Sequence, residues 1–397
     1  MAPRQPRAKL FDLVEAEAIP ISVPQKAAFD AEEELDPYDV FPDATVEDKP
    51  VDDPHSYMYA YRTSSHMFLE KPVHEPILSL SNASLVFNGT AYPSIMDNYL
   101  KQKEAMWAIS EANLTNDLYD WEHYLTAGER IFVMLTLAFF AFADGLVNIN
   151  VAGMINLVTI KEAQFAYAAQ ADQENLHARA YSKMIETYIP EAQLRSRVFN
   201  AVKRIPVLKE KQAWGERWIN DDTPFAIRLI AFAVMEGVYF SGSFAAIFFF
   251  KTRIPAGKKR AAMSGLRKMN RWIARDEGLH VELAVLLFRL LLNRPKQEIV
   301  HQIVREAVLI EDRFINESLK CRLLGINAAL MSQYIRYCAD ELLVSLGYEK
   351  LYNCTIGLEY MAKKGVSTKI NFFEEHVDEY VSIGNSTTRT WKRREEY

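Results

Sequence analysis

The distribution of apolar and polar positions along the chain predicts a helical protein. From about Tyr59 onward, apolar residues recur at the spacing of amphipathic helices, over long stretches that contain few glycines. No hairpin turn signal lies between two runs of alternating apolar and polar residues. We therefore expect an all-α fold.

Two stretches are almost entirely apolar. Residues 131–160 contain a single charged residue, Asp144, and residues 229–250 also contain one, Glu236. Each stretch is long enough to span a bilayer. However, an acid near the middle of a membrane span costs about 2.5–3.5 kcal/mol, and a helix that is apolar on all sides can equally form the centre of a soluble bundle. We predict two buried helices in a protein that does not enter a membrane.

A carboxylate buried in such a helix needs a positive partner, and neither stretch contains a lysine or an arginine. Two Glu-x-x-His pairs, Glu174/His177 and Glu277/His280, point to metal ions as that partner. A separation of three residues on a helix means about 300° of rotation and about 4.5 Å of rise. The Glu and the His of each pair therefore project from the same helix face.

The order of these residues along the chain strengthens the metal hypothesis. Asp144 precedes Glu174 by 30 residues, and Glu236 precedes Glu277 by 41. Each interval suits one helix, a turn and a return to the same height on a neighbouring helix. The 59 residues from His177 to Glu236 leave room for a long crossover. One carboxylate from each of two helices and Glu-x-x-His from two others is the ligand set of ferritin-like dimetal proteins. We predict a ferritin-like helical bundle with a buried dimetal carboxylate site.

The charges of this ligand set identify the kind of metal. Four carboxylates carry a charge of about −4, which two divalent cations neutralise. Oxygen-rich ligands with one imidazole per metal suit iron or manganese better than zinc, which favours thiolates in structural sites. We expect two ions of iron or manganese per chain, because both metals accept these ligands. The predicted ligands are Asp144, Glu174, His177, Glu236, Glu277 and His280.

Such a centre can store iron, activate oxygen against a substrate, or oxidise a protein side chain. Tyr181 bears on the choice, because it follows His177 by four residues and so lies one helical turn along the same face. A phenol beside the metals is an oxidisable target. A dimetal oxidase, a fatty-acid desaturase and an iron-storage protein remain alternatives at this point, although storage calls for a smaller bundle that assembles into a cage.

Four segments resemble the metal-binding segments of the small, radical-generating subunit of class I ribonucleotide reductase, and they occur in that family's order. They are LAFFAFADGLVN, QENLHARAYS, AFAVMEGVYFSGSFAAIFFFK and ARDEGLHVELAVLLF. The similarity extends from about Tyr92 to Tyr380. It implies that Asp144, Glu174 and His177 hold one metal, and that Glu236, Glu277 and His280 hold the other. It also implies that the metals and dioxygen oxidise Tyr181 to a stable radical.

The resemblance assigns further residues. Phe240, Phe244 and Ile273 match the apolar pocket that shields the radical, and they lie at helical steps of four from Glu236 and Glu277. Trp107 and Asp276 match the route that carries the oxidation outward. Asp276 also has a chemical rationale, because a ligand histidine usually donates its second N–H to a carboxylate. Its alternative is a solvated acid beside Arg275. Tyr380 matches a relay tyrosine in a mobile tail.

The resemblance also implies partners. The chain would form a homodimer and act as a ribonucleoside-diphosphate reductase only with a large subunit, which supplies the nucleotide site and the reactive cysteines. The expected domains are a disordered, Pro-rich and acidic extension (1–58), a ferritin-like domain (59–375) and a flexible tail (376–397) that docks on the large subunit. The basic tail, and an interval from Glu236 to Glu277 that is longer than is typical, depart from the family.

Composition sets the remaining expectations. A net charge of −6 argues against a nucleic-acid partner, and we interpret the basic stretch 251–271 as a solvated loop. The N-terminus lacks the apolar core of a signal peptide. The three cysteines, Cys321, Cys338 and Cys354, fit neither a metal knuckle nor a redox CxxC motif. A cytoplasmic location is the simplest interpretation.

Overall fold

The computed structural model describes residues 75–80, 83–84, 86–220, 222–255 and 257–362, and all structural statements below concern these residues. Their regular elements are helices, with no strand among them, so the all-α prediction is confirmed. The expected extension (1–58) and tail (376–397), with Tyr380, lie outside the described residues.

The chain forms a succession of helices, several of them long. The main α-helices are α2 (Pro93–Glu104), α3 (Thr115–His123), α4 (Ala127–Leu157), α5 (Lys161–Tyr188), α6 (Ala192–Arg204), α7 (Pro206–Trp218), α8 (Phe225–Gly237), α9 (Ser241–Phe248), α10 (Ser264–Arg289), α11 (Gln297–Arg313) and α12 (Ala328–Leu346). The shorter elements are η4 (Pro76–Leu78), η6 (Ile109–Glu111), η7 (Phe249–Thr252), the π-helical turn η8 (Phe314–Ser318), η9 (Cys321–Leu324) and α13 (Glu359–Ala362).

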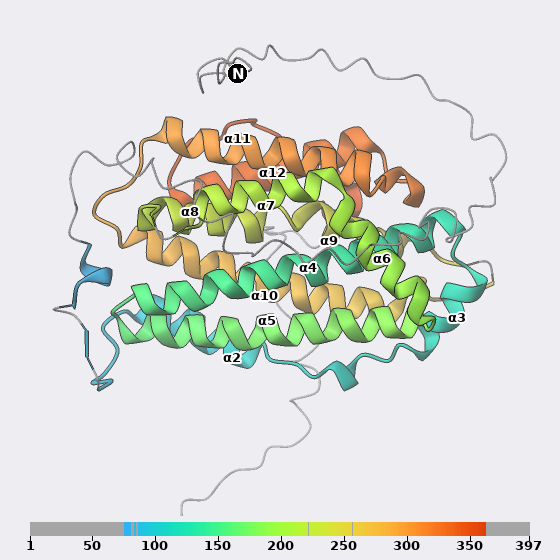
Figure 1. Cartoon of the computed structure of the whole chain (residues 1–397), viewed down its shortest axis with the longest axis horizontal. Coiled ribbons are helices and arrows are strands. Elements are labelled where there is room, and N and C mark those ends of the chain that lie inside the picture. The colour runs from blue at the N-terminus through green and yellow to red at the C-terminus, as the bar shows by residue number, and fades with distance from the viewer. Residues whose placement is uncertain (1–74, 81–82, 85, 221, 256, 363–397) are drawn as a thin grey trace, which may run out of the picture. The chain divides into compact units, whose positions relative to one another are not determined.

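Helices α4, α5, α8 and α10 surround a common centre. Helices α4 and α5 lie side by side along their length, and α10 packs against α8, α5 and α2 (Figure 1). Helices α11 and α12 pack against each other and against α8. Helices α6 and α7 occupy the long crossover that the sequence predicts between the two Glu-x-x-His halves.

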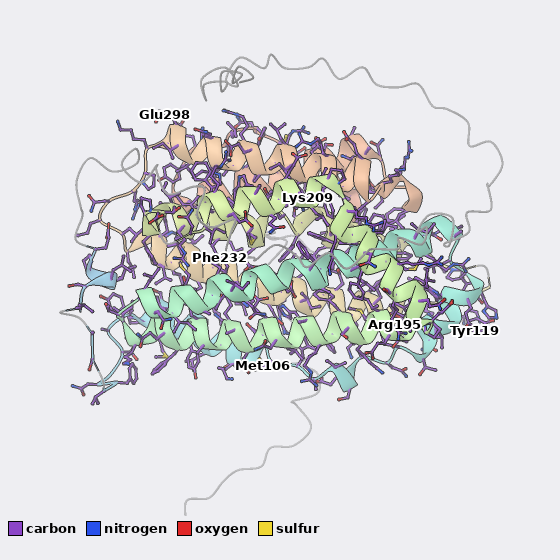
Figure 2. The ribbon with its side chains drawn as sticks, in the orientation of Figure 1. Met106, Tyr119, Arg195, Lys209, Phe232 and Glu298 are labelled. Carbon is purple, nitrogen blue, oxygen red and sulfur yellow. The ribbon has the colours of Figure 1, made fainter. Side chains whose placement is uncertain are left out.

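The two most apolar stretches lie inside this bundle. Ala127–Leu157 and Phe225–Thr252 are long and apolar enough to cross a membrane, but 71% and 100% of their most apolar windows are buried inside the protein. Figure 2 labels Phe232 of α8, which is fully buried, and Glu298 at the edge of the molecule, which is exposed. This burial is what the core helices of a bundle show.

The second apolar stretch is not one continuous helix, so that part of the prediction is wrong. Helix α8 ends at Gly237 and α9 begins at Ser241. Between them, the Tyr239 N–H donates to Val234 O (3.3 Å) and the Ser241 N–H donates to Val238 O (3.2 Å), in place of a regular helical pattern. We call residues 238–242 the α8–α9 break; they include the first two residues of α9. It begins two residues after Glu236.

The start of α10 is held by two acids of α3. Asp117 accepts hydrogen bonds from the backbone N–H groups of Gly265 (2.8 Å) and Leu266 (2.6 Å). Asp120 accepts one from the Met263 N–H (2.9 Å). A Cβ on Gly265 would lie 2.9 Å from Asp117 Oδ2 and 2.8 Å from a backbone oxygen, so only glycine fits there. The backbone of α10 is thereby fixed at its first turn.

The basic stretch 251–271 is a solvated loop only in part. Its last eight residues belong to α10. Two of its arginines form ion pairs with acids of other elements: Arg260 with Asp120 (2.7 Å) and Arg253 with Glu129 (2.9 Å). The exposed lysines Lys258 and Lys259 match the expectation, but much of the positive charge is used within the protein.

Candidate metal centre

The structure brings the six predicted ligands together in the core. Asp144 comes from α4, Glu174 and His177 from α5, Glu236 from α8, and Glu277 and His280 from α10; all six are fully buried. They form two overlapping groups in which one ligand atom of each residue lies within 4.8 Å of the others. One group is Asp144, Glu174 and His177, and the other is Glu174, Glu236, Glu277 and His280.

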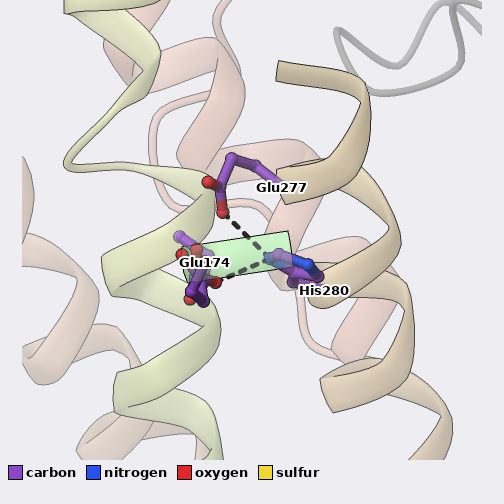
Figure 3. Close-up of side chains that lie close together, drawn as sticks. Glu174, Glu277 and His280 are labelled. Atoms are coloured by element: carbon purple, nitrogen blue, oxygen red, sulfur yellow. Dashed lines mark hydrogen bonds and ion pairs between the residues drawn. The ribbon is translucent and has the colours of Figure 1, made fainter. Parts of the chain in front are cut away.

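Two of the glutamates approach both histidines. His280 Nδ1 lies 3.0 Å from Glu174 Oε1 and 3.1 Å from Glu277 Oε2 (Figure 3). His177 Nδ1 lies 3.1 Å from Glu277 Oε1 and 3.6 Å from Glu174 Oε2. Glu174 and Glu277 would therefore be available as ligands together with either imidazole.

Each imidazole is oriented through its other nitrogen. His177 Nε2 lies 3.1 Å from Asp276 Oδ2, and His280 Nε2 lies 3.0 Å from Gln173 Oε1. Partners of this kind fix the ring and direct the opposite nitrogen toward a metal. Asp276 was predicted from the sequence, whereas Gln173 was not. Its position directly before Glu174 is a weak signal, because an amide beside a glutamate is common on helices.

The electrostatics of the cluster call for cations. Burial, reinforced by Glu174, raises the pKa of Asp144 well above its usual range, and both oxygens of Asp144 lack a hydrogen-bond partner among the described residues. Burial and Glu277 raise the pKa of Glu236 in the same way. Burial lowers the pKa of His280, but the carboxylates of Glu174 and Glu277 outweigh it and raise that pKa to about 9. Four carboxylates and two imidazoles in a dry site fit two divalent cations that prefer oxygen ligands.

Tyr181 lies beside this cluster in an aromatic wall. Its ring stacks on Phe140 at 5.0 Å with an interplanar angle of 18°. Phe140 in turn contacts Phe244 (4.9 Å) and Phe240 (5.8 Å). We call Phe140, Phe240 and Phe244 the phenylalanine wall. Phe140 was not predicted from the sequence, although it precedes Asp144 by four residues, the same helical step that pointed to Phe240 and Phe244.

The wall keeps the Tyr181 phenol dry and neutral. Tyr181 is 2% exposed, and the predicted pocket residue Ile273 is fully buried. Burial, and after it the charge of Asp144, raises the pKa of Tyr181 well above its usual range. The phenol therefore keeps its proton across the physiological pH range.

Asp276 joins a candidate ligand to the buried indole of Trp107. Its Oδ2 accepts a hydrogen bond from Trp107 Nε1 (2.8 Å) and lies 3.1 Å from His177 Nε2. Its Oδ1 accepts two hydrogen bonds from Arg275 (2.8 and 3.0 Å). Asp276 is fully buried, so it is not the solvated acid of the alternative interpretation. The Trp107 ring lies 5.0 Å from Trp272.

Fold and site together define a class of protein. A helical bundle with a buried carboxylate and histidine cluster, supplied by α4, α5, α8 and α10, is a ferritin-like carboxylate protein. The predicted fold class is confirmed.

Comparison with known proteins then gives the family. The family model described as "Ribonucleotide reductase, small chain" matches residues 84–357, and the chain belongs to this family. It is 43% identical to the ribonucleoside-diphosphate reductase small chain of Acanthamoeba polyphaga mimivirus over 86% of this chain and 81% of the relative. It is 44% identical to the small subunit of Dictyostelium discoideum over 78% of this chain and 90% of the relative.

A solved structure supports the same assignment. The ribonucleotide reductase Rnr4 homodimer from Saccharomyces cerevisiae is similar, with a TM-score of 0.66 and 30% identity, over 72% of this chain and 88% of that chain. The resemblance inferred from the four sequence segments is therefore confirmed at the level of the family.

Proposed function

We propose that the chain is the radical-generating subunit of a ribonucleoside-diphosphate reductase. Its six candidate ligands would hold two iron or manganese ions, which supply a strong oxidant when they react with dioxygen. Tyr181 would then be oxidised and store the radical. The observation that carries this proposal is the position of Tyr181, a buried, neutral phenol beside the ligand cluster and behind the phenylalanine wall.

The residues of this chain have defined tasks in that function. Glu174 and Glu277 would hold the metals together with the two imidazoles, which Gln173 and Asp276 orient. The phenylalanine wall excludes water, which protects a radical from quenching. A tyrosine that becomes a neutral radical gives up one electron and one proton. Because the phenylalanine wall covers Tyr181 with apolar rings, the acceptors of both would lie among the candidate ligands.

The radical would leave through the hydrogen-bonded series His177, Asp276 and Trp107. Tyr380 would continue the route, and the tail (376–397) would dock on the large subunit. Nucleotide chemistry would belong to that subunit. In this chain, burial raises the pKa of Cys338 and of Cys321 to about 12, which makes both thiols poor nucleophiles.

Self-association would use an exposed apolar face of α4. Ile149 is 73% exposed and Leu157 is 40% exposed, on a helix whose other side lies in the core. Exposed apolar residues along one helix are typical of an interface, and the similar Rnr4 structure is described as a homodimer. We propose a cytoplasmic homodimer.

Metal loading combined with electron paramagnetic resonance tests the proposal. Iron-loaded protein that has been exposed to oxygen should show a tyrosyl signal. Tyr181→Phe should bind the same two metals per chain and lose the signal. Tyr167→Phe is a matched control, because Tyr167 is another fully buried tyrosine of α5, and it should keep the signal. A metal-loaded Tyr181→Phe protein with an undiminished signal would refute the assignment and reopen the dimetal oxidase alternative.

A further inference from the structure

A buried ion pair outside the metal centre has no task in the function proposed above. Lys211 of α7 and Glu311 of α11 are 7% and 0% exposed and are paired with each other. The Lys211 ammonium also lies over three aromatic rings, those of Phe314 (3.9 Å), Phe139 (4.4 Å) and Tyr239 (4.6 Å). Moving two charges from water into such a core costs several kcal/mol per ion, so further contacts must offset that cost.

Those contacts are with the α8–α9 break. In a continuous helix, the carbonyl of Tyr239 would accept from residue 243, and the N–H of Gly242 would donate to residue 238. At the break, Val238 O instead accepts from the backbone N–H (3.2 Å) and the hydroxyl (2.7 Å) of Ser241. The interruption of the helix therefore leaves one carbonyl and one amide to be stabilised by other groups.

The ion pair reaches the break with both of its charged groups. Lys211 Nζ donates a hydrogen bond to Tyr239 O (3.2 Å), and Glu311 Oε1 lies directly beside Gly242. At Tyr239, a cation thus meets the negative end of a peptide dipole. The ammonium has the sign that this carbonyl requires.

Gly242 is the residue that lets the carboxylate approach. A Cβ at this position would lie 2.8 Å from Glu311 Oε1 and 3.3 Å from Ile315 Cγ1. Any other residue would push Glu311 away from the break.

The break connects a candidate ligand, Glu236, to the phenylalanine wall. Glu236 lies two residues before it, Phe240 lies within it, and Phe244 follows, its N–H donating to Phe240 O (3.0 Å). Phe139, which is in contact with Lys211, also lies 5.7 Å from Phe140 and 6.1 Å from Phe240. The geometry of the break therefore sets where the wall stands relative to Glu236.

We propose that Lys211 and Glu311 are positioning residues, which hold the α8–α9 break and so place Glu236 among the ligands and Phe240 against Phe140. The part that concerns the wall rests on the proposed function, because it assumes that the wall protects a Tyr181 radical. The part that concerns Glu236 requires only that the cluster binds metal.

The experiment uses a double substitution, Lys211→Met with Glu311→Leu. Removing both charges together leaves no unpaired ion, and apolar replacements of buried ion pairs are often neutral for stability or favourable. The full chain should fold, with unchanged far-ultraviolet circular dichroism. Its metal-free form should bind Mn²⁺ at least tenfold more weakly, and its tyrosyl signal after iron loading should decay at least tenfold faster.

The control is a second ion pair between the same two helices. Glu210 and Arg313 also join α7 to α11, but both are half-exposed, whereas Lys211 and Glu311 are buried. Glu210→Leu with Arg313→Met should leave Mn²⁺ affinity and signal decay within twofold of the native values. A folded Lys211/Glu311 double variant that also stays within twofold on both measurements would overturn the proposal.

A third variant decides the question if the double variant does not fold. Gly242→Ala keeps both charges and displaces Glu311 from the break, so it should weaken Mn²⁺ binding and speed up signal decay in the same way. Native behaviour of Gly242→Ala would overturn the proposal. If the native protein gives no tyrosyl signal, the proposed function fails, but the Mn²⁺ comparison still tests the positioning of Glu236.

Discussion

Phe140 offers the sharpest test of the phenylalanine wall. Its ring is 1% exposed and lies in contact with Tyr181, Phe240, Phe244 and Phe139. Phe140→Ala removes the side chain that separates Tyr181 from the rest of the wall. We expect the substitution to shorten the lifetime of the Tyr181 radical, in addition to its effect on stability.

The effect on stability can be estimated from the burial. Replacing a fully buried phenylalanine by alanine costs about 3–5 kcal/mol. At roughly 2 °C per kcal/mol for a domain of this size, the melting temperature should fall by roughly 6–10 °C. The vacated volume borders a phenol and, one helical turn away, the carboxylate of Asp144. A cavity with polar groups in its lining can hold water, whereas a purely apolar one stays dry.

The assay is the decay of the tyrosyl signal in iron-loaded protein at a temperature well below unfolding. Phe288→Ala serves as the control, because Phe288 is also fully buried but packs against Tyr348, away from the wall. Both variants should lose similar stability, while only Phe140→Ala should decay at least tenfold faster. Equal decay rates in the two variants would refute the view that the wall protects the radical.

Three further predictions concern the route, the ligands and the tail. Asp276→Asn should keep the tyrosyl signal but lower nucleotide reduction with the large subunit at least tenfold. The reason is that an amide cannot accept hydrogen bonds from Trp107, His177 and Arg275 together. Unimpaired turnover would exclude Asp276 from the route. The carboxylates of Glu174 and Glu277 outweigh burial and raise the pKa of His280 to about 9, and burial raises the pKa of Asp144 and of Glu236, so a metal must displace protons from these ligands at neutral pH. Mn²⁺ affinity, measured by calorimetry, should therefore rise toward pH 9 by about tenfold per pH unit for each proton displaced; a flat profile would contradict these ligand roles. Tyr380→Phe should keep the radical and abolish turnover, so normal turnover would remove Tyr380 from the route.

The clustering of the candidate ligands was predictable because its signals are local. Glu and His three residues apart share a helix face whatever surrounds them, and a lone acid in an apolar helix implies a compensating charge. The structure accordingly brings Asp144 and Glu236 to the two Glu-x-x-His pairs.

The features that the sequence did not reveal depend on contacts between distant segments. The α8–α9 break is stabilised by Lys211 and Glu311, which lie in other helices, and periodicity within residues 229–250 carries no trace of them. Gln173 matters only because α5 faces α10, so that its amide reaches His280. Phe140 differs from these two, because its helical step from Asp144 was present in the sequence.

The two acids of α3 have a consequence for how this chain tolerates insertions. Asp117 and Asp120 fix the first turn of α10 from outside, so the position of that helix does not depend on the length of the segment that leads into it. Without this anchor, a shift of one residue would turn Glu277 and His280 by about 100° and move them by about 1.5 Å.

Residues added between Glu236 and Met263 would therefore not change the register of Glu277 and His280. The exposed positions Lys258 and Lys259 are therefore suitable sites for attaching a label. A fluorophore or an affinity tag placed there should leave the metal centre in register.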